Sequence, residues 1–194
     1  MATAQKGYAD QSDEELMGLV LRGDRMAFSE VYDRYADMLL RYFYRMLWQD
    51  QEHAEDMVQD LFMKLIRKPE LYDPGRSFRP WLFSVAANMC KNEYRKAEVR
   101  RGAAQEIRMG KELATGSNEL TDRLELADFT LALDRAVEEL EPHHRETFIL
   151  RYRQDLPMKE IAVAMECSEG TVKSRLFYAT KKLAEKLERY RVKS

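Results

Sequence analysis

The apolar side chains between residues 54 and 66 repeat at the three- and four-residue spacing of an α-helix. Pro69 follows this run, and proline ends a helix because it lacks the amide hydrogen that the next turn needs. A strand would instead bury every second residue, so the spacing favours a helix with one face in a core. The members of this apolar face are Ala54, Met57, Val58, Leu61, Phe62, Leu65 and Ile66.

Similar periodicity continues through most of the chain, which has only eight glycines and five prolines among its 194 residues to interrupt it. Ser12 and Glu15 have the spacing of a capping box and predict the start of a first helix. Gly23 and Asp24 break that helix, and a second is expected from about residue 26 to residue 48. The sequence therefore predicts an all-α fold.

The helical pattern falls into two groups, separated by a stretch in which it is lost. Residues 12–96 form the first group and residues 129–194 the second, each long enough to bury a small core. Residues 97–128 are expected to form a flexible linker, with a helix returning towards its end, and residues 1–11 a short tail. We therefore predict two small helical domains joined by a linker.

Charge is unevenly distributed although the formal net charge is only −2. Residues 50–60 contain five acids and no Lys or Arg, whereas residues 76–101 sum to +5 and residues 171–194 to +6. The two basic regions suggest a polyanionic partner that the chain contacts at two places, and the separate acidic region suggests a protein partner. The alternative is that these charges only solvate helix faces.

Acidic and amide side chains continue along the exposed side of the 54–66 helix beyond its first turn. Carboxylates at a helix N-terminus are favoured by the helix dipole, but that benefit fades after the first turn. Asp56, Gln59 and Asp60 lie further along and so need another explanation. They form a protein-binding face or a solvated surface, and the residues alone leave both readings open.

A helix expected to begin near Phe78, with Pro80 at its first position, has an unusual polar side. Cations suit phosphates, an indole suits base stacking and amides suit base edges, so this side resembles a surface for single-stranded nucleic acid. A core tryptophan with ordinary polar neighbours is the alternative. The residues of this side are Trp81, Ser84, Asn88, Lys91, Asn92 and Arg95.

A helix-turn-helix pattern follows near the C-terminus. Pro157 opens a short helix, a turn containing Gly170 follows, and Ser168 is a suitable N-cap for a long second helix. Basic residues on the outer side of the second helix could reach bases and phosphates in the major groove, which favours DNA binding. The outward residues near its start are Lys173, Ser174, Phe177, Tyr178 and Lys181.

The sequence gives little support for an enzyme, a metal centre or a membrane protein. It has no GxxxxGK[ST] phosphate loop, no GxSxG element and no HExxH spacing among its three histidines. Cys90 and Cys167 are too far apart for a CxxC motif and are expected to be buried thiols in a reducing cytoplasm. No apolar run approaches the length that spans a bilayer, and the N-terminus has no signal-peptide pattern. We therefore expect a cytoplasmic, non-enzymatic protein with no metal, no cofactor and no membrane insertion.

Three segments, taken together and in order, resemble the bacterial RNA polymerase sigma factors of the extracytoplasmic-function (ECF) group. They are EHAEDMVQDLFMKLIR, FRPWLFSVAANMCKNEYRK and MKEIAVAMECSEGTVKSRLFYATKKL. Such proteins have only the sigma-2 and sigma-4 domains, so the resemblance implies a sigma-2 helical bundle and a sigma-4 helix-turn-helix. It implies a promoter-specificity subunit that binds core enzyme, reads the −35 and −10 elements and stabilises the melted strand.

The resemblance also implies which residues carry each role. In the family the acidic helix docks on the clamp helices of the β′ subunit, which assigns core-polymerase binding to Asp56, Gln59 and Asp60. The resemblance assigns binding of the melted strand of the −10 element to Trp81, Asn88, Lys91, Asn92, Arg95 and Lys96. It assigns recognition of the −35 element to Lys173, Ser174, Arg175, Phe177, Tyr178 and Lys181. The implied partners also include the β flap of polymerase, promoter DNA and an anti-sigma factor.

The chain departs from the family pattern at a few positions. Lys173 stands where relatives often have Arg, and Tyr178 where they are often basic, so no relative's −35 sequence is carried over. Pro157 replaces a frequent Ser N-cap, which should change the cap and leave the fold intact. Two alternatives remain, namely a sigma mimic that titrates an anti-sigma factor and a stand-alone helix-turn-helix regulator, and the second leaves the acidic helix unexplained.

Overall fold

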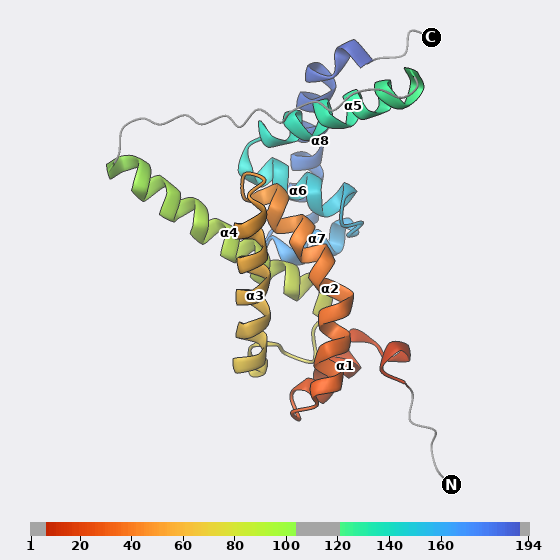
Figure 1. The fold of residues 1–194 in the computed structure, drawn as a ribbon, viewed down its shortest axis with the longest axis vertical. Helices are drawn as coiled ribbons and strands as arrows, with labels where there is room; N and C mark the ends of the chain where they lie inside the picture. Colours follow the sequence, from red (N-terminus) through yellow and green to blue (C-terminus); the bar gives the residue numbers. More distant parts are fainter. Residues whose placement is uncertain (1–6, 104–120, 191–194) are drawn as a thin grey trace.

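The computed structural model describes residues 7–103 and 121–190, with side chains placed for residues 7–99 and 128–190. Every regular element within those two ranges is a helix, which confirms the predicted all-α fold (Figure 1). The middle of the expected linker, residues 104–120, lies outside the described part of the chain.

After a short 3-10 helix at Tyr8–Asp10, the N-terminal half contains the capping box that the sequence predicts. Ser12 Oγ accepts a hydrogen bond from the Glu15 amide at 3.2 Å, and Glu15 Oε2 accepts one from the Ser12 amide at 2.8 Å. Gly23 then adopts a φ of 87°, a conformation that glycine tolerates, and Asp24 caps the next helix. The helices of this half are α1 (Asp13–Val20), α2 (Arg25–Met46), α3 (Gln51–Arg67) and α4 (Phe78–Ala103).

The C-terminal half contains four further α-helices and ends in a short 3-10 turn. Pro157 precedes α7 without a side-chain cap, and the helix forms nonetheless, as predicted. Ser168 caps α8 by accepting a hydrogen bond from the Thr171 amide at 3.1 Å. The elements are α5 (Thr121–Glu138), α6 (Pro142–Tyr152), α7 (Met158–Ala164), α8 (Glu169–Lys186) and the turn Glu188–Tyr190.

The structure differs from the expected boundaries around α4. Pro80 lies at the third position of this helix rather than the first, which proline tolerates because the amides of the first turn have no acceptor within the helix. The helix also continues to Ala103, beyond the expected domain end at residue 96. Likewise α5 begins at Thr121, inside the stretch expected to be linker.

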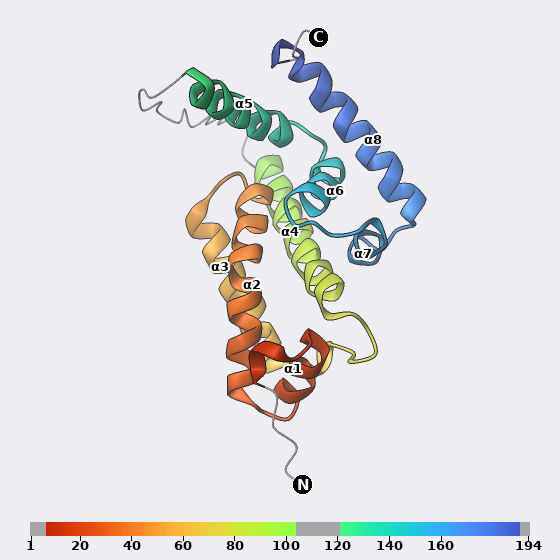
Figure 2. The same cartoon turned by 90° about the vertical axis from the view of Figure 1, so that its right-hand side faces the viewer.

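The two halves share one continuous apolar core. Tyr42 of α2 packs edge-on against Phe83 of α4, with ring centroids 5.5 Å apart, and both side chains are fully buried. Buried residues of α6, α7 and α8, such as Ile149 and Val172, belong to the same cluster. In Figure 2, α4 lies between α2 and α3 on one side and α6 and α7 on the other, and α8 is outermost.

Candidate nucleic-acid and protein interfaces

The acidic face of α3 is fully open to solvent. Asp56, Gln59 and Asp60 are all exposed, as are Glu52 and Glu55 on the same side. Asp50 caps the helix by accepting a hydrogen bond from the His53 amide at 3.0 Å, so the helix dipole already has a carboxylate partner. The carboxylates further along therefore remain available to a partner.

Two apolar side chains extend this acidic face towards the end of α3. Met63 is 43% exposed and Ile66 is 50% exposed. The periodicity placed Ile66 in the core, and that prediction is wrong because the position lies at the edge of the buried stripe. Sequence reasoning missed Met63, although its spacing of four from Gln59 puts it on the same side of the helix. The combined surface can bind a partner that is both basic and apolar.

Trp81 of α4 is half-buried. It therefore fits both interpretations from the sequence, a tryptophan packed in the core and a tryptophan exposed on the polar side of the helix. Its ring lies 5.1 Å from that of Tyr72 and 5.8 Å from that of Phe78, measured between centroids. These contacts fix the indole against the core. Its remaining surface lines two cavities, one towards α3 and one towards α7.

The cavity between α3 and α4 has a volume of about 220 Å³, enough for one planar base. Apolar walls would cover the faces of such a base, and amide and hydroxyl groups would meet its edge. Lys64 of α3 and Lys68, the residue that follows this helix, also line the cavity. Sequence analysis missed both because cations near a helix C-terminus are explained by the helix dipole alone. The polar lining from α4 consists of Trp81, Ser84 and Asn88.

The basic residues beyond this cavity differ in availability. Asn92 and Arg95 are exposed, whereas Lys91 is half-buried and donates a hydrogen bond to Asn88 Oδ1 at 3.3 Å. Lys96 forms an ion pair with Glu93 at 2.6 Å, which partly offsets its charge. The structure therefore brings the predicted −10 residues onto one side of α4.

In the helix-turn-helix, all five side chains predicted to face outward from α8 are exposed. These are Lys173, Ser174, Phe177, Tyr178 and Lys181. Arg175 differs, because it is half-buried and its guanidinium lies 3.8 Å from Cys167 Sγ and 3.9 Å from Met165 Sδ. It therefore supports the turn rather than projecting with the others.

The turn of this motif is built differently from the prediction. Gly170 lies within the first turn of α8, and Glu166 adopts the left-handed conformation with a φ of 51°. The Cys167 amide donates to the Ala162 carbonyl at 3.0 Å and the Glu166 amide to the Val163 carbonyl at 3.2 Å, which completes a Schellman ending for α7. The position that usually holds glycine is thus occupied by a glutamate.

His144, which the sequence analysis considered only as a candidate metal ligand, lies beside the outer face of α8. The His144 ring lies 6.1 Å from that of Tyr178, between centroids, and burial together with the neighbouring His143 lowers the pKa of His144. The neutral form of the imidazole is therefore favoured beside this surface. Within the described residues, no group of His, Cys, Asp and Glu has the arrangement of a metal site.

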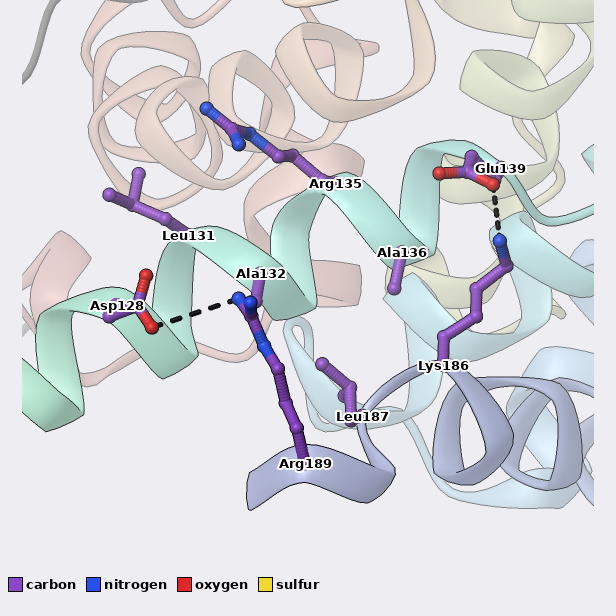
Figure 3. Close-up of a pocket in the computed structure, with 9 residues that line it drawn as sticks. All are labelled: Asp128, Leu131, Ala132, Arg135, Ala136, Glu139, Lys186, Leu187 and Arg189. Atoms are coloured by element: carbon purple, nitrogen blue, oxygen red, sulfur yellow. Dashed lines mark hydrogen bonds and ion pairs between the residues drawn. The ribbon is translucent and has the colours of Figure 1, made fainter.

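An open cleft of about 320 Å³ lies between α5 and the end of α8 (Figure 3). Arg189 and Asp128 approach to 3.7 Å across it, and Lys186 forms an ion pair with Glu139. These contacts connect the final residues of the described chain to α5. Among the described helices, none combines the length and apolar character needed to cross a membrane.

Comparison with known proteins agrees with this architecture. The family model for sigma-70 region 2 matches residues 31–100, and that for sigma-70 region 4 matches residues 130–183. The ECF RNA polymerase sigma factor SigL of Mycobacterium tuberculosis is 35% identical over 157 residues, covering 79% of this chain and 84% of SigL. BldN of Streptomyces coelicolor, another ECF sigma factor, is 30% identical over 186 residues, covering 92% of this chain and 68% of BldN.

Solved structures show a similar fold. CnrH, in complex with the cytosolic domain of CnrY, is 25% identical with a TM-score of 0.67, covering 92% of this chain and 99% of CnrH. The sigma factor RpoE of Bartonella quintana, bound to the anti-sigma factor NepR, is 24% identical with a TM-score of 0.68, covering 84% of this chain and 98% of RpoE. By its sequence relatives and both family models, this chain belongs to the ECF group of bacterial RNA polymerase sigma factors.

Proposed function

We propose a division of labour for this promoter-specificity subunit, in which one surface binds polymerase and two bind DNA. The N-terminal half, through the end of α4 at Ala103, acts as the sigma-2 domain, and the C-terminal half, from α5 onwards, as the sigma-4 domain. The observation that carries the proposal is that the acidic side chains of α3 and the basic side chains of α8 are both exposed, on helices that lie on opposite sides of α4 (Figure 2). One protein and one DNA duplex can therefore be bound together.

The α3 face docks on core polymerase through Asp56, Gln59 and Asp60. The exposed carboxylates attract a basic surface over a distance, while Met63 and Ile66 add apolar contact area. By family resemblance, the matching surface is the clamp helices of the β′ subunit. The β flap is a second polymerase contact, proposed for the sigma-4 domain on the same ground.

The face of α4 stabilises the melted −10 strand. Melting costs about 1.4 kcal/mol per base-pair step in lost stacking. Stacking on an aromatic side chain returns about 1–3 kcal/mol per base, so Trp81 and the adjoining cavity could offset much of this cost. Asn88 and Asn92 contact base edges, and Lys91, Arg95 and Lys96 follow the phosphates. Opening is thus driven by differential binding, and no nucleotide hydrolysis by this chain is proposed.

The outer face of α8 reads the −35 duplex. Lys173 and Ser174 reach acceptors in the major groove, while Phe177 and Tyr178 offer apolar contact to thymine methyl groups. Lys181 neutralises a phosphate, and Arg175 acts indirectly by holding the turn. The protein therefore works where polymerase and DNA are, in the cytoplasm.

Binding to polymerase is tested by Asp56→Arg. Because the side chain is exposed, reversal of its charge should leave the fold intact and abolish co-purification with core enzyme. Asp37→Arg, which changes an exposed carboxylate on α2, is the control and should co-purify normally. Normal co-purification of Asp56→Arg would refute this role of α3.

Run-off transcription on genomic fragments with purified core polymerase tests the function as a whole. Initiation at discrete sites is expected of a promoter-specificity subunit. A sigma mimic would give none, and a stand-alone helix-turn-helix regulator would bind DNA without core enzyme. We further propose an anti-sigma factor as a regulatory partner, since RpoE of similar fold was solved with one.

A further inference from the structure

Helix α4 begins with an amide that is capped from a different helix. Glu14 Oε1 of α1 accepts a hydrogen bond from the Phe78 amide at 2.9 Å, although the two residues are 64 positions apart in sequence. A residue that precedes a helix usually caps its second or third amide, and Pro80, the third residue of α4, has no amide hydrogen. Figure 2 shows α1 close to the loop that leads into α4. The start of α4 therefore depends on α1.

The part of α1 that carries Glu14 is itself held against α2. Asp13 forms an ion pair with Arg34 at 2.9 Å and accepts a hydrogen bond from the Tyr35 hydroxyl. Tyr35 also packs edge-on against the Phe78 ring, with centroids 5.4 Å apart. Helices α1 and α2 therefore hold both the amide and the ring of Phe78.

Phe78 belongs to the group of rings that supports Trp81. Its centroid lies 5.8 Å from that of Trp81 and 5.2 Å from that of Tyr72, and the centroid of Tyr72 lies 5.1 Å from that of Trp81. Phe78 and Tyr72 are at most 1% exposed, so close packing leaves these two rings no room to shift independently. The position of the Trp81 indole therefore follows that of the first turn of α4.

The base-sized cavity between α3 and α4 has walls on both sides of the loop that precedes this turn. Leu71 lines the cavity from before the loop of residues 73–77, and Trp81 lines it from after the loop. Every residue of the loop is exposed, so packing of the loop itself contributes little to the separation of the two walls. A shift at the start of α4 would therefore change the width of the cavity.

We propose that Glu14 is a positioning residue for the −10 surface: through the Phe78 amide it holds Trp81 at the separation from α3 that a base requires. The inference rests on the proposed function of Trp81. Glu14 contacts no nucleotide in this scheme and acts only through α4. The position requires an acceptor oxygen, so glutamine should replace glutamate there, whereas alanine should not.

The contact is tested first by the fluorescence of Trp81 in the full chain. The sequence has two tryptophans, so Trp48→Phe leaves Trp81 as the only indole. In that background Glu14→Ala should move the emission to longer wavelength and increase quenching by acrylamide, whereas Glu14→Gln should match its parent. Asp24→Ala, which removes the carboxylate cap of α2, is the control and should also match. Equal emission and quenching in Glu14→Ala and its parent would overturn the proposal.

Promoter opening by the holoenzyme tests the consequence of this contact. The probe is a promoter found by run-off transcription, with 2-aminopurine replacing an adenine of its −10 element. Glu14→Ala should lower the yield of open complex about tenfold, the size of a lost base stack, with duplex binding through α8 unchanged. Glu14→Gln should open the promoter normally. A loss of opening in Glu14→Gln or Asp24→Ala equal to that in Glu14→Ala would overturn the proposal.

Two further measurements keep the outcomes separable. Should Glu14→Ala lose its helical circular dichroism, Glu14→Asp replaces it, because it keeps the charge and retracts the carboxylate by one methylene. Unchanged quenching and opening in Glu14→Asp would then overturn the proposal. Opening by a Trp81→Ala holoenzyme tests the proposed function itself. Normal opening by that variant would refute the role of Trp81, whereas lost opening there with normal opening by Glu14→Ala would refute only the positioning by Glu14.

Discussion

Glu146 shows how a single buried group can connect the two halves. It is 5% exposed and faces the hydroxyl of Tyr42, with Lys91 and Arg175 as the neighbouring cations. Burial raises the pKa of Glu146, and the hydrogen bond and the two cations only partly oppose this. Its charged form is therefore disfavoured in the folded protein.

The pH dependence of stability follows from this group. A raised pKa means that the folded state binds the proton more tightly than the unfolded state, so the contribution of Glu146 is greatest below its ordinary value of 4.5. It is lost as pH rises through the folded pKa. Glu146→Gln keeps an acceptor for Tyr42 and cannot ionise, so it should raise the free energy of unfolding at neutral pH and flatten its decline. Urea titrations between pH 5 and 8 measure this, with Glu185→Gln as an exposed control.

Two glycines should respond oppositely to alanine. Gly170 is helical, and an added Cβ would meet only Ser168 Oγ at 3.6 Å, so Gly170→Ala should raise the free energy of unfolding by about 0.5–1 kcal/mol. Gly23 has a φ of 87°, so Gly23→Ala should lower it by about 1 kcal/mol or more. Thermal denaturation compares the two variants, and a destabilised Gly170→Ala would contradict the placement of Gly170 in α8.

At the scale of elements, the sequence predicted which residues form helices better than it predicted which helices pack against one another. The spacing of apolar residues in α3 and the capping residues Ser12 and Ser168 were sufficient because they act locally. The burial of Ala87 in α4 was missed because α4 packs chiefly against α7, which is about seventy residues away in sequence. Glu166 was missed as the turn residue because glycine is the usual signal for a left-handed conformation, and here hydrogen bonds impose it.

The candidate site was predictable to a similar extent. Helical spacing placed the five outward residues of α8 correctly, since exposure on an end helix depends on few neighbours. It could not predict that Arg175 turns towards Cys167, or that Lys64 and Lys68 line the cavity beside Trp81. Those features depend on side-chain direction and on the packing of α3 against α4.

In α8, Lys173→Ala should weaken promoter binding by the holoenzyme by about 1–3 kcal/mol, since it removes the side chain that we propose donates to bases in the major groove. The loss should depend on the sequence of the −35 element. Lys182→Ala, which removes a cation that donates to the Glu139 carbonyl, is the comparison on the same helix. A Lys173→Ala holoenzyme that transcribes equally well from all −35 variants would argue against base reading by this residue.

The molecule as a whole has one apolar core, although its sequence reads as two domains. Residues from both halves belong to the same buried cluster, and the polar contacts of Glu146 and Gln154 cross between them. Contacts of this kind couple the stability of one half to that of the other. The two tryptophans lie in the N-terminal half, so their fluorescence reports on that half alone.

Unfolding of the free protein by urea should therefore be a single transition. Tryptophan fluorescence follows the N-terminal half and far-ultraviolet circular dichroism follows all helices, and the two midpoints should coincide. Arg79 donates a hydrogen bond to the Gln154 carbonyl, and Gln154 donates one to the Met38 carbonyl. Arg79→Ala combined with Gln154→Ala removes these contacts between the halves, so in this double variant the two midpoints should separate. Separate midpoints in the native protein would show that the shared core adds little stability.

The core shared by both halves sets a cost for any change in their arrangement. A partner that moved α7 away from α4 would expose side chains that are now buried, so its own contacts would have to outweigh that loss.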